Sequence, residues 1–554
     1  MNKIKWLLAI TILGALLRFW GLGQNPPGLY WDEVSLGWNA YSILKTGLDE
    51  HGRFLPIDTF FAFGDYKPPL YIYAAIPSIW LFGLNEFAVR LPSALAGTLL
   101  IIVTYLLAKV LLRSHLSVRQ GETFSDSTTL LATLLIAISP WSATLSRVAF
   151  ESNLAVLFNA SGFLFFLYAV RKSSKWLMLS VFCFVLAAYT FNANRLLSPI
   201  FLVTLTIIYF RRAVSNWRWW VVSAFVGIIL ALPMLGHLRS PEGKLRWNEV
   251  NIFSNLEVIK ESNSRREVDG NTLMGRIFHH RYLGYSRLFL EHYLEHFNLK
   301  YLFVQGDRNP RINIPDMGQM YLVELPFLII GLISLMRPMG FMAAKEKVLL
   351  LLWLLLAAVP AGLARETPHA LRSASTLPVP QIIVALGIMK LVKKFQISNF
   401  KFQIFAISCF LFLASLLHFQ FVYWRYYPNE WAGEWLTSYK NLVLYLRQTG
   451  DPYRTIYVTP DLGRPYVYFL FYNQYDPKKY IQEAKDGGRT GDMFGFYNVS
   501  YFNKYKFYVP DLATIAPDEL VVTRADNPPS GFELLKTISD TNGYPQFNVI
   551  RRRE

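Results

Sequence analysis

Two adjacent carboxylates, Asp32 and Glu33, follow the first long apolar run of the chain. A carboxylate at such a place can take a proton from a hydroxyl group. Lys67 lies in the same polar segment and can stabilise negative charge that develops on a phosphate. Two prolines follow Lys67 and fix the backbone behind it, which suits an ammonium group held in one place. These residues together predict chemistry between a hydroxyl group and a phosphate.

Further polar side chains occupy short segments between later apolar runs. Charges at the ends of membrane spans cost free energy unless they pair or face a wet cavity, so we expect one shared cavity. Aromatic side chains of the outer segments, Tyr66 among them, can stack on a sugar ring, although aromatic belts also place such residues there. The residues expected at this cavity, besides those named above, are Arg147, Glu151, Tyr189, Arg195, His369 and Arg372.

Each of these residues also has a plainer interpretation. Asp32 can cap the helix that follows it, and Glu33 can be a first-turn acid favoured by the helix dipole. Lys67 can reach towards lipid headgroups. Arg147 and Glu151 lie four residues apart, so a mutual ion pair can be their only role. Capping does not exclude a catalytic role.

Other cationic and metal-like patterns also have plainer interpretations. Arg195 and Arg372 can be ordinary interfacial arginines, and His369 can be structural. A helical stretch with Glu291, His292, Glu295 and His296 resembles a metal site but lacks an evident third ligand. We therefore predict no metal site from the sequence. A divalent ion held between carboxylates and a phosphate stays an open alternative.

The elements that must position these residues are apolar runs near bilayer length, separated by short polar segments. The chain is 53% hydrophobic and 17% charged, which is unlike a soluble domain. We predict a polytopic all-α membrane protein with about eleven transmembrane helices. The expected spans are residues 6–22, 89–112, 129–146, 152–170, 176–190, 196–210, 219–236, 321–336, 347–364, 374–391 and 403–422.

The charges between the spans set the orientation. With Lys3 and Lys5 on the cytoplasmic side, every second loop is basic, as the positive-inside rule requires. This pattern places the N-terminus in the cytoplasm and the C-terminus outside it, in the plasma (inner) membrane. The same pattern, rather than nucleic-acid binding, explains the net charge of +17. The basic residues of the predicted cytoplasmic loops are Arg113 and Arg119; Arg171, Lys172 and Lys175; Arg211, Arg212 and Arg218; Arg337, Lys345 and Lys347; and Lys390, Lys393, Lys394 and Lys401.

The expected outer segments divide the chain further. Residues 1–422 are predicted to form the transmembrane domain, with a first outer loop at 23–88 and a large one at 237–320. The first loop is expected to contain interface helices, because Val34, Trp38 and Tyr41 recur at helical spacing. Residues 423–554 are predicted to form a small α/β domain outside the cytoplasm, with strands near 454–458, 505–509, 519–523 and 545–551 and a helix near 465–485.

The motifs around these residues resemble the GT-C type of lipid-phosphate-dependent glycosyltransferases in both order and spacing. The resemblance covers residues 1–380 and is strongest to bacterial relatives of protein O-mannosyltransferases and to lipid A aminoarabinose transferases. It rests on Trp31-Asp32-Glu33, Tyr66-Lys67-Pro68-Pro69, Arg90-Leu91-Pro92-Ser93, Ser146-Arg147 with Glu151-Ser152, Asn194-Arg195, and His369 with Leu371-Arg372-Ser373.

The resemblance implies an inverting glycosyltransferase whose site lies on the extracytoplasmic face. It implies catalytic roles for Asp32, for Glu33 as its supporting neighbour and for Glu151, which stands where relatives often carry an aspartate. It implies contacts to the donor phosphate from the cationic residues of the set. Those contacts are Lys67, Arg195 and Arg372, and the remaining site residues are Arg147, His369, Tyr66 and Tyr189.

The expected partners are a polyprenyl-phosphate-linked sugar as donor, a protein, lipid or glycan as acceptor, and the surrounding membrane lipids. Two alternatives stand beside this interpretation: a flippase or transporter of lipid-linked sugars, and a non-catalytic protein that binds them. Transporters tend to place binding charges near the bilayer midplane and to contain repeats, whereas here the charges gather at one face. Asp32 and Lys67 together favour an enzyme over a binding protein.

Overall fold

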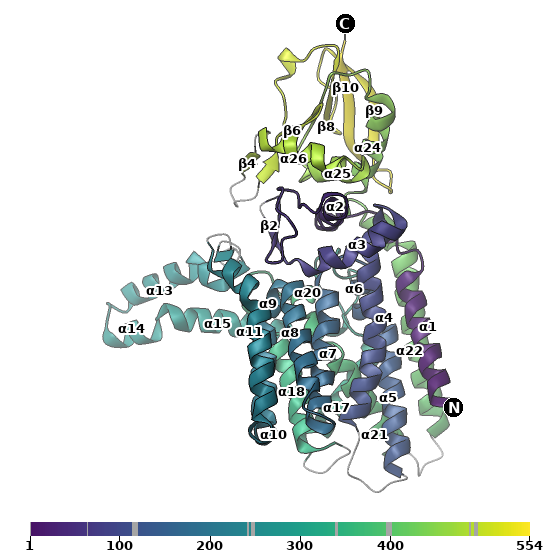
Figure 1. Ribbon diagram of the computed structural model, residues 1–554, viewed down its shortest axis with the longest axis vertical. Helices are drawn as coiled ribbons and strands as arrows, with labels where there is room; N and C mark the ends of the chain where they lie inside the picture. Colours follow the sequence, from purple (N-terminus) through teal and green to yellow (C-terminus); the bar gives the residue numbers. More distant parts are fainter. Residues whose placement is uncertain are drawn as a thin grey trace. The chain divides into compact units, whose positions relative to one another are not determined.

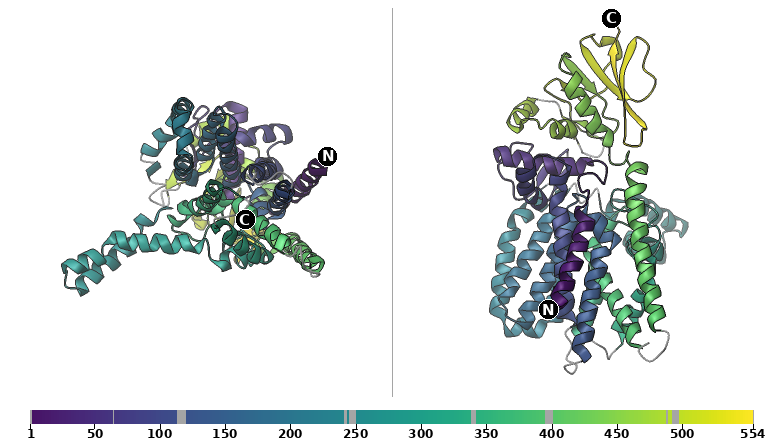
Figure 2. Two further views of the ribbon diagram at one scale, coloured as in Figure 1. Left: turned by 90° about the horizontal axis from the view of Figure 1, so that it is seen from below. Right: turned by 90° about the vertical axis from the view of Figure 1, so that its right-hand side faces the viewer.

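The computed structural model describes residues 2–63, 65–112, 120–240, 243–244, 250–337, 342–394, 401–486, 489–491 and 497–553. They form two compact units, each assembled from several stretches of the chain (Figure 1, Figure 2). Unit 1 comprises Met1–Arg18, Leu95–Ser146 and Glu151–Phe419, and unit 2 comprises Phe19–Ala94, Arg147–Phe150 and Gln420–Glu554.

Unit 1 is a bundle of apolar helices that run side by side (Figure 1). Helix α7 packs on α8, α8 packs on α9 and α11, and α21 packs on α5 and α17. The helices are α5 (Gln120–Ile138), α6 (Pro140–Ser146), α7 (Ser152–Arg171), α8 (Trp176–Thr190), α9 (Asn192–Ile208), α10 (Phe210–Ser215), α11 (Trp217–Arg239), η2 (Leu322–Glu324), α17 (Leu325–Met336), α18 (Ala344–Ala357), α19 (Val359–Gly362), α20 (Ala370–Ser373), η3 (Ala374–Thr376) and α21 (Val379–Lys394), with most of α1 (Asn2–Phe19), α4 (Glu86–Leu111) and α22 (Lys401–Arg425).

Aromatic side chains fill the middle of this bundle. Phe163 of α7 stacks on Trp353 of α18, with ring centroids 3.7 Å apart and planes within 9°. Phe184 and Phe201 meet Phe163 edge-on from α8 and α9, at 5.5 and 4.8 Å. All four rings are buried, so this cluster ties α7, α8, α9 and α18 together.

A proline bend separates α5 from α6. Because Pro140 has no N–H group, the carbonyl oxygen of Ile136 lacks the partner that a continuous helix would supply. Arg18, which has no exposed surface, donates to that oxygen at 3.2 Å and to the carbonyl oxygen of Ala137 at 2.9 Å. It also donates to the side chain of Ser142 at 2.8 Å. Arg18 therefore anchors α1 to the bend.

The apolar helices show that the chain is a membrane protein. Among the described residues, four helices are long and apolar enough to cross a bilayer: Glu86–Leu111, Ser152–Arg171, Trp217–Arg239 and Ala406–Glu430. Two further pairs qualify only as bent spans, Ser125–Ile138 with Pro140–Ser146 (52°) and Ala370–Thr376 with Val379–Val392 (54°). Together they give up to six spans, so the full set of eleven stays a prediction.

The shorter apolar helices explain part of this difference. Leu70–Phe82, Trp176–Thr190, Asn192–Ile208 and Leu322–Met336 are apolar but shorter than a bilayer-spanning helix. Of the basic loop residues, Arg113 and Arg119 lie outside the described residues, as do the side chains of Lys393, Lys394 and Lys401. The expected orientation of the two termini stays a prediction.

The large outer loop is helical. An arm of three helices, α13, α14 and α15, extends sideways from the bundle of unit 1 (Figure 1, Figure 2). Asn255, Thr272 and His280 cap these helices through their side chains. The elements of the loop are η1 (Ile252–Ser254), α13 (Leu256–Val268), α14 (Leu273–Phe278), α15 (Arg281–Glu295) and α16 (Leu299–Phe303).

Unit 2 joins the first outer loop to the C-terminal residues. Helix α2 (Trp31–Thr46) packs against α3 (Leu70–Phe82) and α25 (Pro465–Tyr472), and it is buried over most of its length. The expected interface helix therefore exists, but protein covers most of it. The domain boundary predicted at residue 422 stays a prediction, and in the structure residues 19–94 and 420–554 belong to one compact unit.

The C-terminal residues form the expected sheet. Six strands lie in the order β6-β7-β3-β8-β10-β9, in which β3 runs parallel to β7 and β8 and the other pairs are antiparallel. The predicted strands are present, and β6 and β9 are additional strands of this sheet, while the predicted single helix is two. The elements are α23 (Tyr427–Glu430), α24 (Thr437–Thr449), β3 (Thr455–Val458), α25, α26 (Pro477–Asp486), β4 (Arg489–Gly491), β5 (Tyr497–Val499), β6 (Tyr501–Phe502), β7 (Tyr505–Lys506), η5 (Leu512–Thr514), β8 (Glu519–Arg524), β9 (Phe532–Ser539) and β10 (Pro545–Arg552).

Candidate active site

Lys67 lies between two carboxylates in unit 2. Its Nζ atom is 2.6 Å from Oδ1 of Asp32 and 2.7 Å from Oδ2 of Asp65. The side chain of Asp32 is 24% exposed, while those of Lys67 and Asp65 are 11% and 7% exposed. The structure thus brings together the predicted pair and adds Asp65. Asp32 is the most accessible member, as a group that meets a substrate must be.

A short hairpin positions the lysine. Strand β1 (Phe60–Ala62) pairs with β2 (Asp65–Lys67), which ends where the two prolines begin. Side chains two residues apart on a strand share a face, so Asp65 and Lys67 point the same way. The hydroxyl of Thr59 donates to the Lys67 carbonyl oxygen at 3.1 Å. Tyr66 points to the other face and meets Phe61 edge-on at 5.1 Å.

Glu33 has surroundings different from those of its neighbour. It is fully buried and accepts from Arg90 at 2.9 Å (Oε1) and 3.0 Å (Oε2). It also accepts the backbone N–H groups of Ala149 at 2.7 Å and Tyr30 at 3.3 Å. Helix α2 begins at Trp31, so Glu33 rather than Asp32 performs the capping role. These contacts favour a structural role for Glu33.

Arg147 ties the segment before α2 to α22. Its guanidinium donates to the hydroxyl of Tyr423 at 2.8 Å and to the carbonyl oxygen of Asn25 at 2.9 Å. The same group lies over the rings of Tyr423 and Trp424, 5.1 and 5.0 Å from their centroids. Arg147 is 2% exposed, so its contacts are those of a buried anchor.

A second polar cluster lies in unit 1, around α20. The N–H group of Ala370 donates to Oδ2 of Asp307 at 2.6 Å, and that of His369 donates to Nε2 of His296 at 3.0 Å. Arg372 donates to the carbonyl oxygen of Glu366 at 3.3 Å. His369 and Arg372 thus lie on one short segment. Hydrogen bonds from its backbone N–H groups to His296 and Asp307 hold this segment in place.

Burial sets the charge state of this second cluster. Burial lowers the pKa of His296 to about 4. Burial, with Arg372 next to it, holds the pKa of His369 well below its ordinary value. Burial also raises the pKa of Asp307, although the hydrogen bonds that its carboxylate accepts from backbone N–H groups act in the opposite direction. Both histidines are therefore neutral at pH 7, and His296 can accept the hydrogen bond from the His369 backbone.

The helix with the metal-like spacing has other partners. His292 contacts the carbonyl oxygen of Ala364 at 2.8 Å, and Glu295 accepts from the hydroxyl of Thr367 at 2.5 Å. With His296, these side chains hold the loop before α20. In the part of the chain that the structure describes, no three His, Cys, Asp or Glu side chains are grouped to hold a metal ion.

The remaining predicted residues of unit 1 occupy separate places. Glu151 is 8% exposed and directly precedes α7. Arg195 lies in the first turn of α9. Tyr189 donates to the carbonyl oxygen of Leu230 at 2.7 Å and accepts from the N–H of Met234, so it binds α8 to α11.

Beside Arg195, three polar side chains form a buried hydrogen-bonded group. Asn159 donates to Asn194 at 3.1 Å and to Ser375 at 3.0 Å, and Ser375 donates to Asn194 at 3.3 Å. Only Asn194 belonged to a motif singled out in the sequence. Isolated amides inside apolar runs, such as Asn159, are the signal that could have identified the others.

Comparisons with known proteins agree with the fold. Residues 8–239 match the family model described as dolichyl-phosphate-mannose-protein mannosyltransferase. By sequence, no curated protein matches the chain. Among solved structures, ArnT from Cupriavidus metallidurans in the apo state is similar, with a TM-score of 0.57 and 13% identity over 99% of this chain and 98% of that one. The same protein bound to undecaprenyl phosphate gives a TM-score of 0.55 and 14% identity, with the same coverage.

Proposed function

We propose that the chain is an inverting glycosyltransferase of the GT-C type, because its residues 8–239 match the protein mannosyltransferase model and its fold is similar to that of ArnT. The proposed donor is a sugar linked to polyprenyl phosphate, and the acceptor is a hydroxyl group on the extracytoplasmic face. The family model and the solved structure bound to undecaprenyl phosphate support a lipid-phosphate donor.

The position of Lys67 between Asp32 and Asp65 is the observation that carries this proposal. The three groups hold two formal negative charges and one positive charge at separations of 2.6 and 2.7 Å. A phosphate that approaches Lys67 competes with Asp32 for the ammonium. Asp65 is the less exposed carboxylate and keeps the lysine in place. Donor binding therefore frees the Asp32 carboxylate at the moment when a base is required.

The proposed reaction is a single displacement at the anomeric carbon. Asp32 takes the proton of the acceptor hydroxyl, and the acceptor oxygen forms a bond to the anomeric carbon. The bond between that carbon and the phosphate oxygen breaks, and polyprenyl phosphate leaves with the electron pair. Lys67 stabilises the charge that develops on this phosphate. A phosphate leaves without the help of a general acid.

Inversion follows from the use of one base. A carboxylate that activates the acceptor from the side opposite the leaving group attaches it to the opposite face of the sugar ring. The transition state has oxocarbenium character, as in inverting glycosidases. The expected product therefore has the anomeric configuration opposite to that of the donor, which nuclear magnetic resonance of the purified product tests.

The deciding experiment supplies the purified full-length protein with a panel of polyprenyl-phosphate sugars and a membrane extract containing acceptors. Mass spectrometry then searches for lipids, peptides or glycans that have gained one sugar residue. The wild-type protein is expected to transfer at least one sugar of the panel, and the Asp32→Asn variant is expected to transfer none. If no donor is turned over but one binds, a transporter or binding protein replaces the proposed enzyme.

A further inference from the structure

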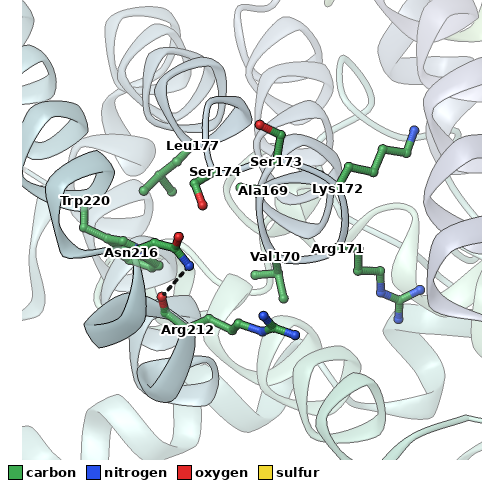
Figure 3. A pocket seen from close by; sticks show the side chains of 10 residues that line it. All are labelled: Ala169, Val170, Arg171, Lys172, Ser173, Ser174, Leu177, Arg212, Asn216 and Trp220. Atoms are coloured by element: carbon green, nitrogen blue, oxygen red, sulfur yellow. Dashed lines mark hydrogen bonds between the residues drawn. The ribbon is translucent and has the colours of Figure 1, made fainter.

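A basic pocket lies at the end of the unit 1 helices where α7 ends and α8 and α11 begin. It has a volume of about 240 Å³ and lies far along α7 from Glu151, at the opposite end of that helix. Figure 3 shows its lining, which is apolar on some sides and basic or hydroxylated on others. The lining residues that matter here are Val170, Leu177 and Trp220, with Lys172, Ser173 and Arg212.

Three cationic side chains line this pocket, and they differ in the contacts that they make. Arg171 is paired with Glu346 at 2.7 Å, so its charge is largely balanced. The ammonium of Lys172 lies 3.8 Å from the centre of the Tyr168 ring and is exposed. Arg212 extends from α10 towards Val170 (Figure 3), and within the described ranges no ion pair engages it. The pocket therefore has a surplus of positive charge.

The surroundings match the headgroup level of a membrane. Trp217 and Trp220 lie in the first turn of α11, and Trp217 is 59% exposed. Tryptophan favours this level because its ring is apolar and its N–H group is polar. The sequence also predicts both loops of the pocket to be cytoplasmic. Apolar walls next to unbalanced cations suit a molecule with a phosphate and an acyl chain, rather than a free anion.

We propose that this pocket binds the phosphate of an anionic phospholipid of the cytoplasmic leaflet. Basic pockets between transmembrane helices recognise such headgroups. Arg212 holds the phosphate, Lys172 adds positive charge further along the lining, and the acyl chain lies along Leu177 and Trp220. This site shares no residue with the cluster of Lys67 and the two carboxylates, and it does not depend on the proposed transferase activity.

The test titrates the full-length protein in detergent with phosphatidylglycerol and with phosphatidylcholine of the same acyl chains, and native mass spectrometry counts bound lipids. The variants are Arg212→Gln and the double substitution with Lys172→Gln. Arg211→Gln is the matched control, because Arg211 is adjacent, exposed and outside the pocket lining. All are surface substitutions, and circular dichroism verifies the fold of each.

We expect the wild-type protein to bind phosphatidylglycerol more tightly than phosphatidylcholine. Each lost pocket cation should weaken phosphatidylglycerol binding by about fivefold, and Arg211→Gln should leave it unchanged. Equal loss in the Arg211 and Arg212 variants, or equal binding of both lipids, would overturn the proposal. Displacement of the lipid by millimolar glycerol phosphate would also overturn it, because the site would then be one for soluble phosphate.

Discussion

Glu33 and Arg90 form a two-point ion pair in which neither side chain has exposed surface. The Nε and Nη2 atoms of the guanidinium lie 2.9 and 3.0 Å from the two carboxylate oxygens. Arg90 also donates to the carbonyl oxygens of Leu22 at 3.3 Å and Pro26 at 2.8 Å. The pair therefore fixes the start of α2, and with it the position of Asp32.

Glu33→Gln should destabilise the protein strongly, because it leaves the charge of Arg90 buried without its counter-ion. The expected loss is about 3–5 kcal/mol, the range for breaking a buried pair by removing one partner. Thermal unfolding of the purified protein measures this. Glu533→Gln is the control, since Glu533 pairs with Arg551 at the surface (49% and 40% exposed) and should lose under about 1 kcal/mol. Similar melting temperatures for the two variants would contradict the anchoring role.

Asp32→Asn should lower kcat by about 10²–10⁴-fold, the contribution of a positioned general base. Folding should change little, because asparagine has the same size and Lys67 keeps Asp65. The donor should bind at least as tightly as it does to the wild-type protein, because the carboxylate that competes with its phosphate for Lys67 has lost its charge. The measurement is kcat together with the donor Kd. Asp58→Asn is a suitable control, because that carboxylate lies in the same outer loop and pairs only with Arg53 among the contacts described. Transfer at the wild-type rate by Asp32→Asn would show that another group is the base.

Lys67→Ala should weaken binding of the donor and lower kcat, because the phosphate loses its ammonium partner in both the ground state and the transition state. We expect at least a tenfold rise in the donor Kd, which corresponds to about 1.4 kcal/mol. Isothermal titration with an unreactive polyprenyl phosphate measures it. The exposed Lys45, in the last turn of α2, provides the control Lys45→Ala. An unchanged Kd in Lys67→Ala would remove this residue from the donor site.

Asp65→Asn should separate positioning from catalysis. The base Asp32 is still present, so kcat should fall less than in Asp32→Asn. The cluster also loses one negative charge, so an anionic donor should bind at least as tightly as it does to the wild-type protein. A comparison of kcat and the donor Kd in Asp65→Asn and Asp32→Asn distinguishes the positioning role from the catalytic one. A loss in kcat equal to that of Asp32→Asn would mean that Asp65 is itself the base.

Acid should loosen the segment that carries His369 and Arg372. The folded pKa of His296 is about 4, below the 6.5 of an unperturbed histidine, so the unfolded chain binds more protons below pH 6.5. The stability contributed by neutral His296 is therefore complete above pH 6.5 and is lost as the pH falls towards 4. Melting temperatures between pH 7.5 and 5 should decline, and His296→Gln should make the decline shallower. An identical pH dependence in the variant would contradict this assignment.

The sequence predicted that Asp32 and Lys67 lie at the same membrane face, but not that they pair with each other or that Glu33 and Asp32 have different surroundings. The partner that buries Glu33 is Arg90, 57 residues away, and no local pattern reveals such a contact. Asp65 was within reach of sequence reasoning. It lies two residues before Lys67, and in an extended segment that spacing puts both side chains on one face.

The helices, too, were predictable only in part. Hydropathy locates apolar runs but does not show where a run bends. The run at residues 129–146 is two helices that meet at 52°, because Pro140 interrupts the backbone hydrogen bonds. The sheet strands near 455 and 519 were predictable because their apolar residues are continuous. Strand β9 alternates buried and exposed residues weakly and was missed.

Unit 2 combines an early and a late part of the chain, so its parts become available at different times during synthesis. Glu50, in the first outer loop, accepts from the hydroxyl of Tyr466 at 2.8 Å, and the hydroxyl of Tyr468 donates to the carbonyl oxygen of Leu29 at 3.1 Å. A ribosome makes residues 29–50 hundreds of residues before it makes α25. The loop that carries Asp32 and Lys67 must therefore wait without these partners until α25 has been translated.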